Sequence, residues 1–194
     1  MSGLGNTPTP VSLMSAIAEC LAQREERVLL VDAIDPSTGS SLLSAPAATA
    51  QGRASPRLLP VEKQTPANGK GNSQLQKVFG LSEYLSRECE GVADLIQPTA
   101  CPGVDLISSG ANRFPNEAMA SSCITELFDH CRSTYTMILV AGPPVVDRAD
   151  FQMLAARADA IMLAADRASI GDPINRAVVQ DLIELRAPVI GIVA

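Results

Sequence analysis

Short apolar runs recur along this chain of 194 residues and alternate with segments of helical periodicity. The first run is RVLLVD at residues 27–32, and the later runs are equally aliphatic. Such runs are typical of parallel strands that helices cover on both faces. The alternation therefore predicts an α/β fold with a parallel sheet between two helical layers. Strands are expected at residues 27–32, 103–110, 135–145, 160–166 and 188–193, and helices at 11–23, 81–85, 92–96, 116–132, 149–158 and 172–186.

One long segment, at about residues 36–77, interrupts this alternation. It is rich in Pro, Ser, Ala, Gly and Thr and shows no sustained period. An ordinary connection within a compact domain is much shorter. We interpret the segment as a flexible insertion within a single domain that covers residues 1–194.

The composition excludes several classes of function. A net charge of −6 argues against a nucleic-acid partner, which would need clustered Lys and Arg. The five cysteines form no C-x-x-C pair, and His130 beside Cys131 lacks the spacing of further metal ligands, so we expect reduced thiols and no metal site. No apolar run approaches the roughly 18 residues of a membrane span.

The stretch GNTPTPVSLMSAIAECLAQ, residues 5–23, has the outline of a loop followed by a helix. Thr9 can serve as the N-cap, and Pro10 suits the first helical position, where an N–H group is not needed. A phosphate-binding loop would instead place a glycine and a lysine here. The stretch is therefore a good helix start with a poor set of phosphate ligands.

Four residues stand where predicted strands end. In an open parallel sheet, ligands bind outside the carboxyl ends of the strands. Asp32 is the best candidate for a functional residue among them, although an aspartate in this position also commonly caps a turn. The four strand ends carry Asp32, Ser108, Ala141 and Asp166.

Seven segments, taken in order, resemble one family. They are LAQREERVLLVDA, VFGLSEYLSRE, LIQPT, PGVDLISSG, PNEAMASS, YTMILVAGPPV and RADAIMLAADRAS. They resemble the bacterial tyrosine kinases, the cytoplasmic autokinase domains of capsule and exopolysaccharide export systems, within the ParA/MinD-like P-loop ATPases. The resemblance covers nearly the whole chain outside residues 36–77. It implies a P-loop NTPase fold.

The resemblance also implies a central strand directly before the phosphate loop. The sequence has no room for that strand between its first residue and the loop. We therefore expect either a sheet that lacks its first central strand or a fragment of a longer protein. An open position in a parallel sheet exposes apolar surface and unpaired backbone, which favours pairing with a partner strand.

Members of this family bind ATP through a Gly-rich loop with Gly-Lys-Ser/Thr. The resemblance places Thr7, Pro8, Thr9 and Pro10 where the family has Gly, an acidic residue, Gly and Lys. Val11 and Ser12 fall on the two hydroxyl positions. Pro10 removes the cation and one backbone donor, and Thr9 adds a β-branched side chain where the backbone should approach phosphate.

Two further family elements supply carboxylates to the metal. In the first, Asp32 is retained, Ile34 occupies the next carboxylate position, and Asp35 lies one step out of register. In the second, Ala141 falls where the family has a metal-organising Asp before the Pro-Pro turn. Phosphoryl transfer depends on such charges, so the resemblance implies a degenerate site with no catalytic residue and no bound cofactor.

The sequence thus favours a catalytically inactive, kinase-like scaffold or regulator in exopolysaccharide or capsule biosynthesis. Its expected partner is a polysaccharide-export membrane protein of the chain-length regulator type or an active kinase paralogue, with a homo-oligomer as a further option. The expected location is the cytoplasm, at the inner membrane through the partner. The alternative is an active tyrosine autokinase that uses Mg-ATP with an atypical loop. A ParA/MinD-like positioning protein is a weaker third hypothesis, since it needs ATP-driven dimerisation.

Overall fold

A computed structural model describes residues 10–38, 79–89, 91–115, 118–143, 148–164 and 173–193. The core of the predicted insertion, Thr7, Thr9 and Asp166 lie outside the described residues. So do the side chains of Pro10, Val11 and Ser12, which belong to a helix that is itself described.

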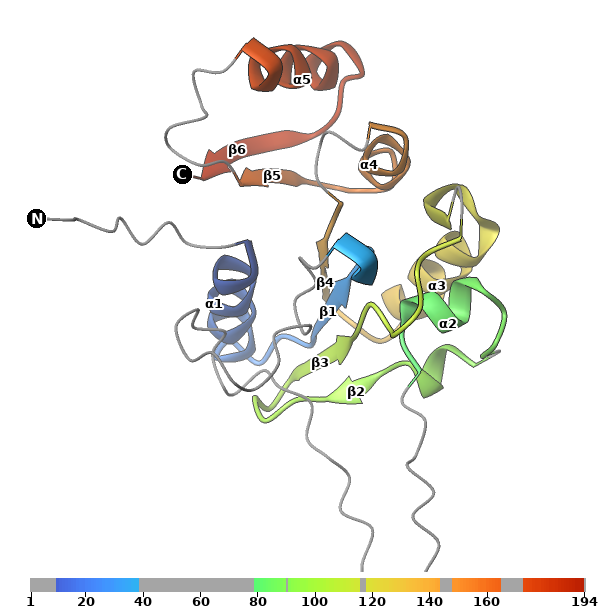
Figure 1. The fold of residues 1–194 in the computed structure, drawn as a ribbon. Helices are drawn as coiled ribbons and strands as arrows, with labels where there is room; N and C mark the ends of the chain where they lie inside the picture. The colour runs from blue at the N-terminus through green and yellow to red at the C-terminus, as the bar shows by residue number, and fades with distance from the viewer. Residues whose placement is uncertain are drawn as a thin grey trace, which may run out of the picture.

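A four-stranded sheet lies at the centre of the molecule (Figure 1). Strand β1 pairs in parallel with β3 on one side and with β4 on the other, and β2 pairs antiparallel with β3. The order is β2-β3-β1-β4. The strands are β1 (Val28–Asp32), β2 (Gln97–Pro98), β3 (Val104–Ile107) and β4 (Met137–Ala141).

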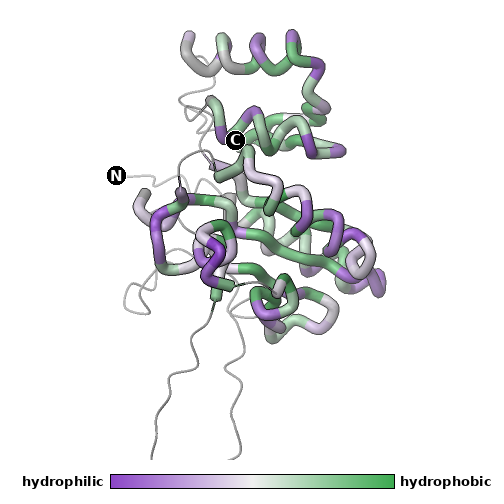
Figure 2. The backbone as a smooth tube through the Cα atoms, turned by 90° about the vertical axis from the view of Figure 1, so that its right-hand side faces the viewer, coloured by the Kyte–Doolittle hydropathy of each residue, from purple (hydrophilic) through white to green (hydrophobic). Residues whose placement is uncertain are grey.

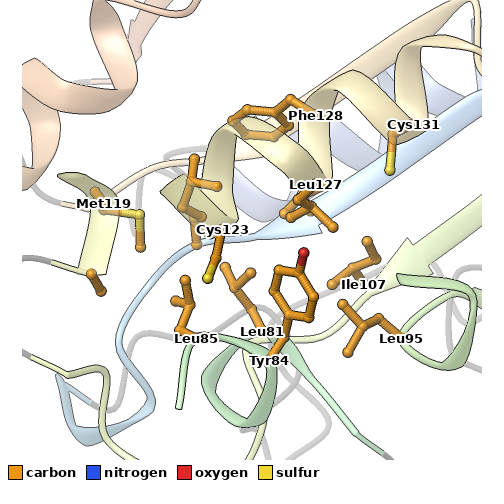
Figure 3. Packing of buried hydrophobic residues seen from close by; sticks show 14 of the residues in the cluster. Leu81, Tyr84, Leu85, Leu95, Ile107, Met119, Cys123, Leu127, Phe128 and Cys131 are labelled. Carbon is orange, nitrogen blue, oxygen red and sulfur yellow. The ribbon is translucent and has the colours of Figure 1, made fainter. Parts of the chain in front are cut away.

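Helices cover both faces of this sheet, because its strands are apolar on both faces. On one face, Ala18 of helix α1 packs on alternate residues of β1 and β3, such as Leu30 and Leu106. On the other face, Leu29 and its neighbours pack under α2 and α3 around Leu127 (Figure 3). Figure 2 shows the hydrophobic residues concentrated along the central strands. The helices are α1 (Pro10–Ala22), α2 (Leu81–Leu85) and α3 (Ser122–Arg132), and short 3-10 turns are η1 (Pro36–Thr38), η3 (Val92–Asp94) and η4 (Ala118–Ala120).

A separate two-stranded parallel sheet follows in the chain. Helix α5 lies over one face of this two-stranded sheet, and helix α4 lies between the two-stranded sheet and α3 (Figure 1). In the described residues no strand pairing joins β4 to β5. The elements are α4 (Arg148–Ala155), β5 (Ile161–Ala164), α5 (Pro173–Glu184) and β6 (Val189–Val193).

The predicted α/β fold, with a mostly parallel sheet between helices, is confirmed. One strand departs from the predicted parallel arrangement, since β2 pairs antiparallel with β3. This strand is only two residues long and contains Pro98, which has no N–H group, so no apolar run marks it. None of the described helices is long and apolar enough to cross a membrane.

The helix expected at residues 116–132 begins later, at Ser122. Ser121 is its N-cap, and its hydroxyl oxygen accepts a hydrogen bond from the N–H of Cys123 at 3.2 Å. The preceding residues 118–120 form the turn η4 instead. Periodicity alone did not distinguish the turn from the helix, because Ala118 and Met119 are buried as well.

Candidate functional site

The carboxyl ends of three neighbouring strands form one edge of the four-stranded sheet. Val31 lies beside Ile107 in the parallel register, so Asp32 and Ser108 follow at the same level. Asp32 in turn lies directly beside Ala141 of β4. The sheet therefore brings together three of the four predicted strand ends, and the fourth, Asp166, lies outside the described residues.

The first turn of α1 lies toward this same edge. The helix ends at Ala22 and a short turn leads into β1 at Val28, so helix and strand run in opposite directions. The helix begins at Pro10, in agreement with the predicted helix start. Because proline has no N–H group, the loop before it would have one backbone donor fewer for a phosphate.

Asp32 has no exposed surface (0%). Its carboxylate accepts a hydrogen bond from the N–H of Ile34 at 3.2 Å, which is the turn-capping role that aspartate takes at strand ends. Beside it, the carbonyl oxygen of Ala141 accepts the N–H of Ala33 at 2.9 Å. A buried methyl group thus stands next to Asp32 where the resemblance implies a second, metal-organising carboxylate.

Asp35 holds two loops together near this edge. Its carboxylate oxygens accept the N–H of Ser37 at 2.8 Å and the N–H of Phe114 at 3.3 Å, and Arg113 lies 4.0 Å away. Partial burial acts to raise the pKa of Asp35, but these hydrogen bonds and the Arg113 guanidinium outweigh it and hold the pKa below its usual value. The carboxylate is therefore engaged in structure, consistent with the view that it does not simply replace the missing carboxylate at Ile34.

Sequence reasoning missed Glu83, a buried acid (1% exposed) on α2. Its carboxylate accepts the N–H of Gly80 at 2.8 Å, the N–H of Ala111 at 3.1 Å and the side-chain amide of Asn112 at 3.2 Å. These bonds tie the start of α2 to the loop after β3. The signal was present in the sequence, since a glutamate three residues after a helix-capping position commonly bonds back to it.

The electrostatics of Glu83 follow from these contacts. Burial acts to raise its pKa, but the N–H groups of Ala111 and Gly80, with the Ser82 side chain, outweigh burial and hold the pKa below its usual value. The side chain is an ionised structural anchor. Gly110, with φ of +93°, is required beside it, because a Cβ there would collide with Ser82 and with the Glu83 carboxylate.

The arrangement is an α/β fold with a mostly parallel sheet, and the candidate residues lie at the carboxyl edge of that sheet. A solved ParA family ATPase from Chlorobium tepidum has the same fold, with a TM-score of 0.50, 18% identity and 92% of this chain and 63% of that chain covered. The VpsO kinase domain gives a TM-score of 0.65 at 21% identity, with 96% of this chain and 78% of that chain covered.

The curated proteins that are similar to this chain in sequence are tyrosine-protein kinases. The tyrosine-protein kinase wzc of Salmonella typhimurium is 26% identical over 157 residues, which are 79% of this chain. This chain spans about a fifth (22%) of the length of the curated relatives it matches. No protein-family model matches the chain. The predicted resemblance to the bacterial tyrosine kinases is confirmed.

Proposed function

We propose that this chain is a non-catalytic, kinase-like scaffold or regulator of exopolysaccharide or capsule assembly. The observation that carries the proposal is the pairing of Asp32 with Ala141 at the carboxyl edge. An ATP site of this class needs charge on both sides of the phosphates, and here one strand end carries a methyl group while the other carries a turn-capping carboxylate.

The distribution of lysines supports the same proposal. The chain has three, Lys63, Lys70 and Lys77, and none comes before the strand that ends at Asp32. Loss of one electrostatic donor typically costs about 10²–10³ in rate. A chain that has neither this lysine nor, at Ala141, the carboxylate is therefore expected to give no useful turnover.

The edge of β4 is the surface that we propose for the partner. In the described residues β4 pairs only with β1, and its side chains are aliphatic, with Met137 41% exposed. An unpaired strand edge binds an added strand through main-chain hydrogen bonds. The proposed partner is an export protein of the chain-length regulator type or an active kinase paralogue. We further propose a cytoplasmic location, close to the inner membrane through that partner, and self-association remains part of the proposal.

Isothermal titration with Mg-ATP tests the proposal. We expect no heat of binding up to millimolar ATP, because the anion would meet no fixed cation at the start of α1. The alternative function, an ATP-dependent tyrosine autokinase with an atypical loop, rests on Asp32 lying at the strand end that α1 approaches. Micromolar binding that Asp32→Ala abolishes would contradict the expected absence of an ATP site and would favour this alternative.

The two tyrosines of the chain give a second prediction. Tyr84 lies inside the core between α2 and α3 (Figure 3), and the hydroxyl of Tyr135 donates to the carboxylate of Asp105 at 2.7 Å. Burial raises the pKa of both phenols. Because a phosphoacceptor hydroxyl must reach a kinase active site, we expect intact-mass spectrometry to find no phosphate on the folded chain after incubation with an active bacterial tyrosine kinase and Mg-ATP. The kinase's own phosphorylation is the control, and stoichiometric phosphotyrosine on this chain would contradict the prediction.

A further inference from the structure

We propose that residues 110–114, called here the strap, form a conformational device that links the carboxyl edge of the four-stranded sheet to helix α2. The strap follows β3 closely in the chain, and carboxylates from two other parts of the fold hold it. Glu83 of α2 accepts the N–H of Ala111 at 3.1 Å. Asp35, in the loop that follows β1, accepts the N–H of Phe114 at 3.3 Å. A change at Asp35 therefore reaches α2 through a short length of backbone.

The first turn of α2 depends on the chain around the start of the strap. The N–H groups of Leu81 and Ser82 donate to the carbonyl oxygens of the two residues that precede the strap, each at 2.8 Å. The first N–H groups of a helix have no acceptor within the helix, so these contacts supply one. Ser82 also contacts the strap itself, since its hydroxyl oxygen accepts the N–H of Asn112 at 3.2 Å. The start of α2 therefore keeps its acceptors only while the strap stays in place.

The two ends of the strap are held unequally. At the α2 end, a Cβ on Gly80 would collide with the backbone of Gly110, and the Glu83 carboxylate has almost no exposed surface. At the other end, the side chain of Asp35 is 23% exposed, and its ion pair with Arg113 is long, at 4.0 Å. Exposed ion pairs contribute little to stability. The strap is therefore fixed at Gly110 and can open at Asp35.

Phe114 adds an apolar contact to this polar path. Its side chain, 8% exposed, belongs to the hydrophobic cluster that also contains Leu81 and Tyr84 of α2. Without the Asp35 carboxylate, this end of the strap would depend on the side-chain contacts of Phe114, so it would open more often. Local opening of this kind leaves the strands of the sheet paired. Because Asp35 comes shortly after Asp32 in the chain, a group bound at the carboxyl edge that engaged Asp35 would act on α2 as well.

Hydrogen–deuterium exchange of the whole chain, followed amide by amide with NMR, tests this inference. Asp35→Ala should accelerate exchange at Leu81 and Ser82 at least about fivefold and leave the amides of β1 and β3 unchanged. Asp35→Asn keeps an oxygen that can accept the N–H of Phe114, so it should restore most of the protection. Asp129→Ala removes an exposed aspartate from another ion pair and is the matched control, which should change neither α2 nor the sheet.

A double variant shows whether the two carboxylates act through one strap. When Asp35→Ala is combined with Glu83→Gln, exchange at Asn112 should rise by less than the product of the two single factors, because either loss alone already loosens the strap. Factors that simply multiply would overturn the inference. Faster exchange confined to Ser37 and Phe114 in Asp35→Ala would also overturn it, as would an equal acceleration in β1, which would show a general loss of stability.

Discussion

Glu83→Ala should lower the free energy of unfolding by about 3 kcal/mol or more, since each buried amide left without an acceptor costs about 1–3 kcal/mol. The substitution leaves the N–H groups of Gly80 and Ala111 without their acceptor and removes a hydrogen bond from the side-chain amide of Asn112. Urea unfolding followed by circular dichroism measures the loss. The matched control is Glu126→Ala, at an exposed position of α3, which should stay within about 0.5 kcal/mol of the unmodified chain.

The pH dependence of this stabilisation follows from the lowered pKa of Glu83. A carboxyl group whose pKa is lower in the folded than in the unfolded state stabilises the fold fully above the unfolded pKa of about 4.3. That contribution disappears as the pH falls through the folded pKa. The difference in stability between the unmodified chain and Glu83→Gln should therefore shrink below about pH 4. If this difference in stability grew as the pH fell, the result would contradict a stabilising role of the ionised Glu83 carboxylate.

Ala141→Asp should also destabilise the protein strongly, by about 3 kcal/mol near neutral pH, the scale for an unpaired buried charge. The new carboxylate would lie beside Asp32, at a position only 4% exposed. Burial and the like charge would raise its pKa in the folded state. The fold would then keep its stability below the unfolded pKa of about 4 and lose it as the pH rises through the raised value.

The same variant distinguishes a lost metal site from a site that is structural throughout. If Asp32 serves only as a turn cap, millimolar Mg²⁺ should leave the melting temperature of Ala141→Asp unchanged. Ala141→Asn has nearly the same shape without the charge and serves as the control. If Mg²⁺ instead raises the melting temperature of Ala141→Asp and not that of Ala141→Asn, two carboxylates suffice to form a metal site here. That result would contradict a role of Asp32 as a turn cap only.

Much of the fold could be predicted because strands and helices in a parallel α/β protein leave strong local patterns. The run that becomes β1 is buried at every position, as an uninterrupted aliphatic sequence predicts. Strand β2 left no such pattern, since it depends on pairing with β3 and not on its own residues. The start of α3 depends on the Ser121 cap, whose position the apolar periodicity does not reveal.

Part of the candidate site could likewise be predicted from the sequence, and part could not. The sequence predicts that Asp32 and Ala141 both end strands of one sheet, but that the two residues are neighbours follows only from the strand order of the structure. The spacing of Glu83 from Gly80 could have indicated its bond to the start of α2, but not the bond that it accepts from the N–H of Ala111, 28 residues away along the chain. The hydrogen bond from the N–H of Phe114 to the carboxylate of Asp35 spans 79 residues, and no sequence pattern indicates it either. Contacts across such separations exist only once the sheet has formed.

The two outer strands of the four-stranded sheet are unequal, and this sets how copies of the chain could assemble. Strand β2 is two residues long, and Pro98 leaves a gap in any ladder that a neighbour could build on it. Strand β4 has five residues and no proline, so the N–H groups that do not face β1 can all donate to an added strand. Within this sheet β4 is therefore the better edge for an added strand, and two copies that pair through β4 leave only the short β2 edges of this sheet outside.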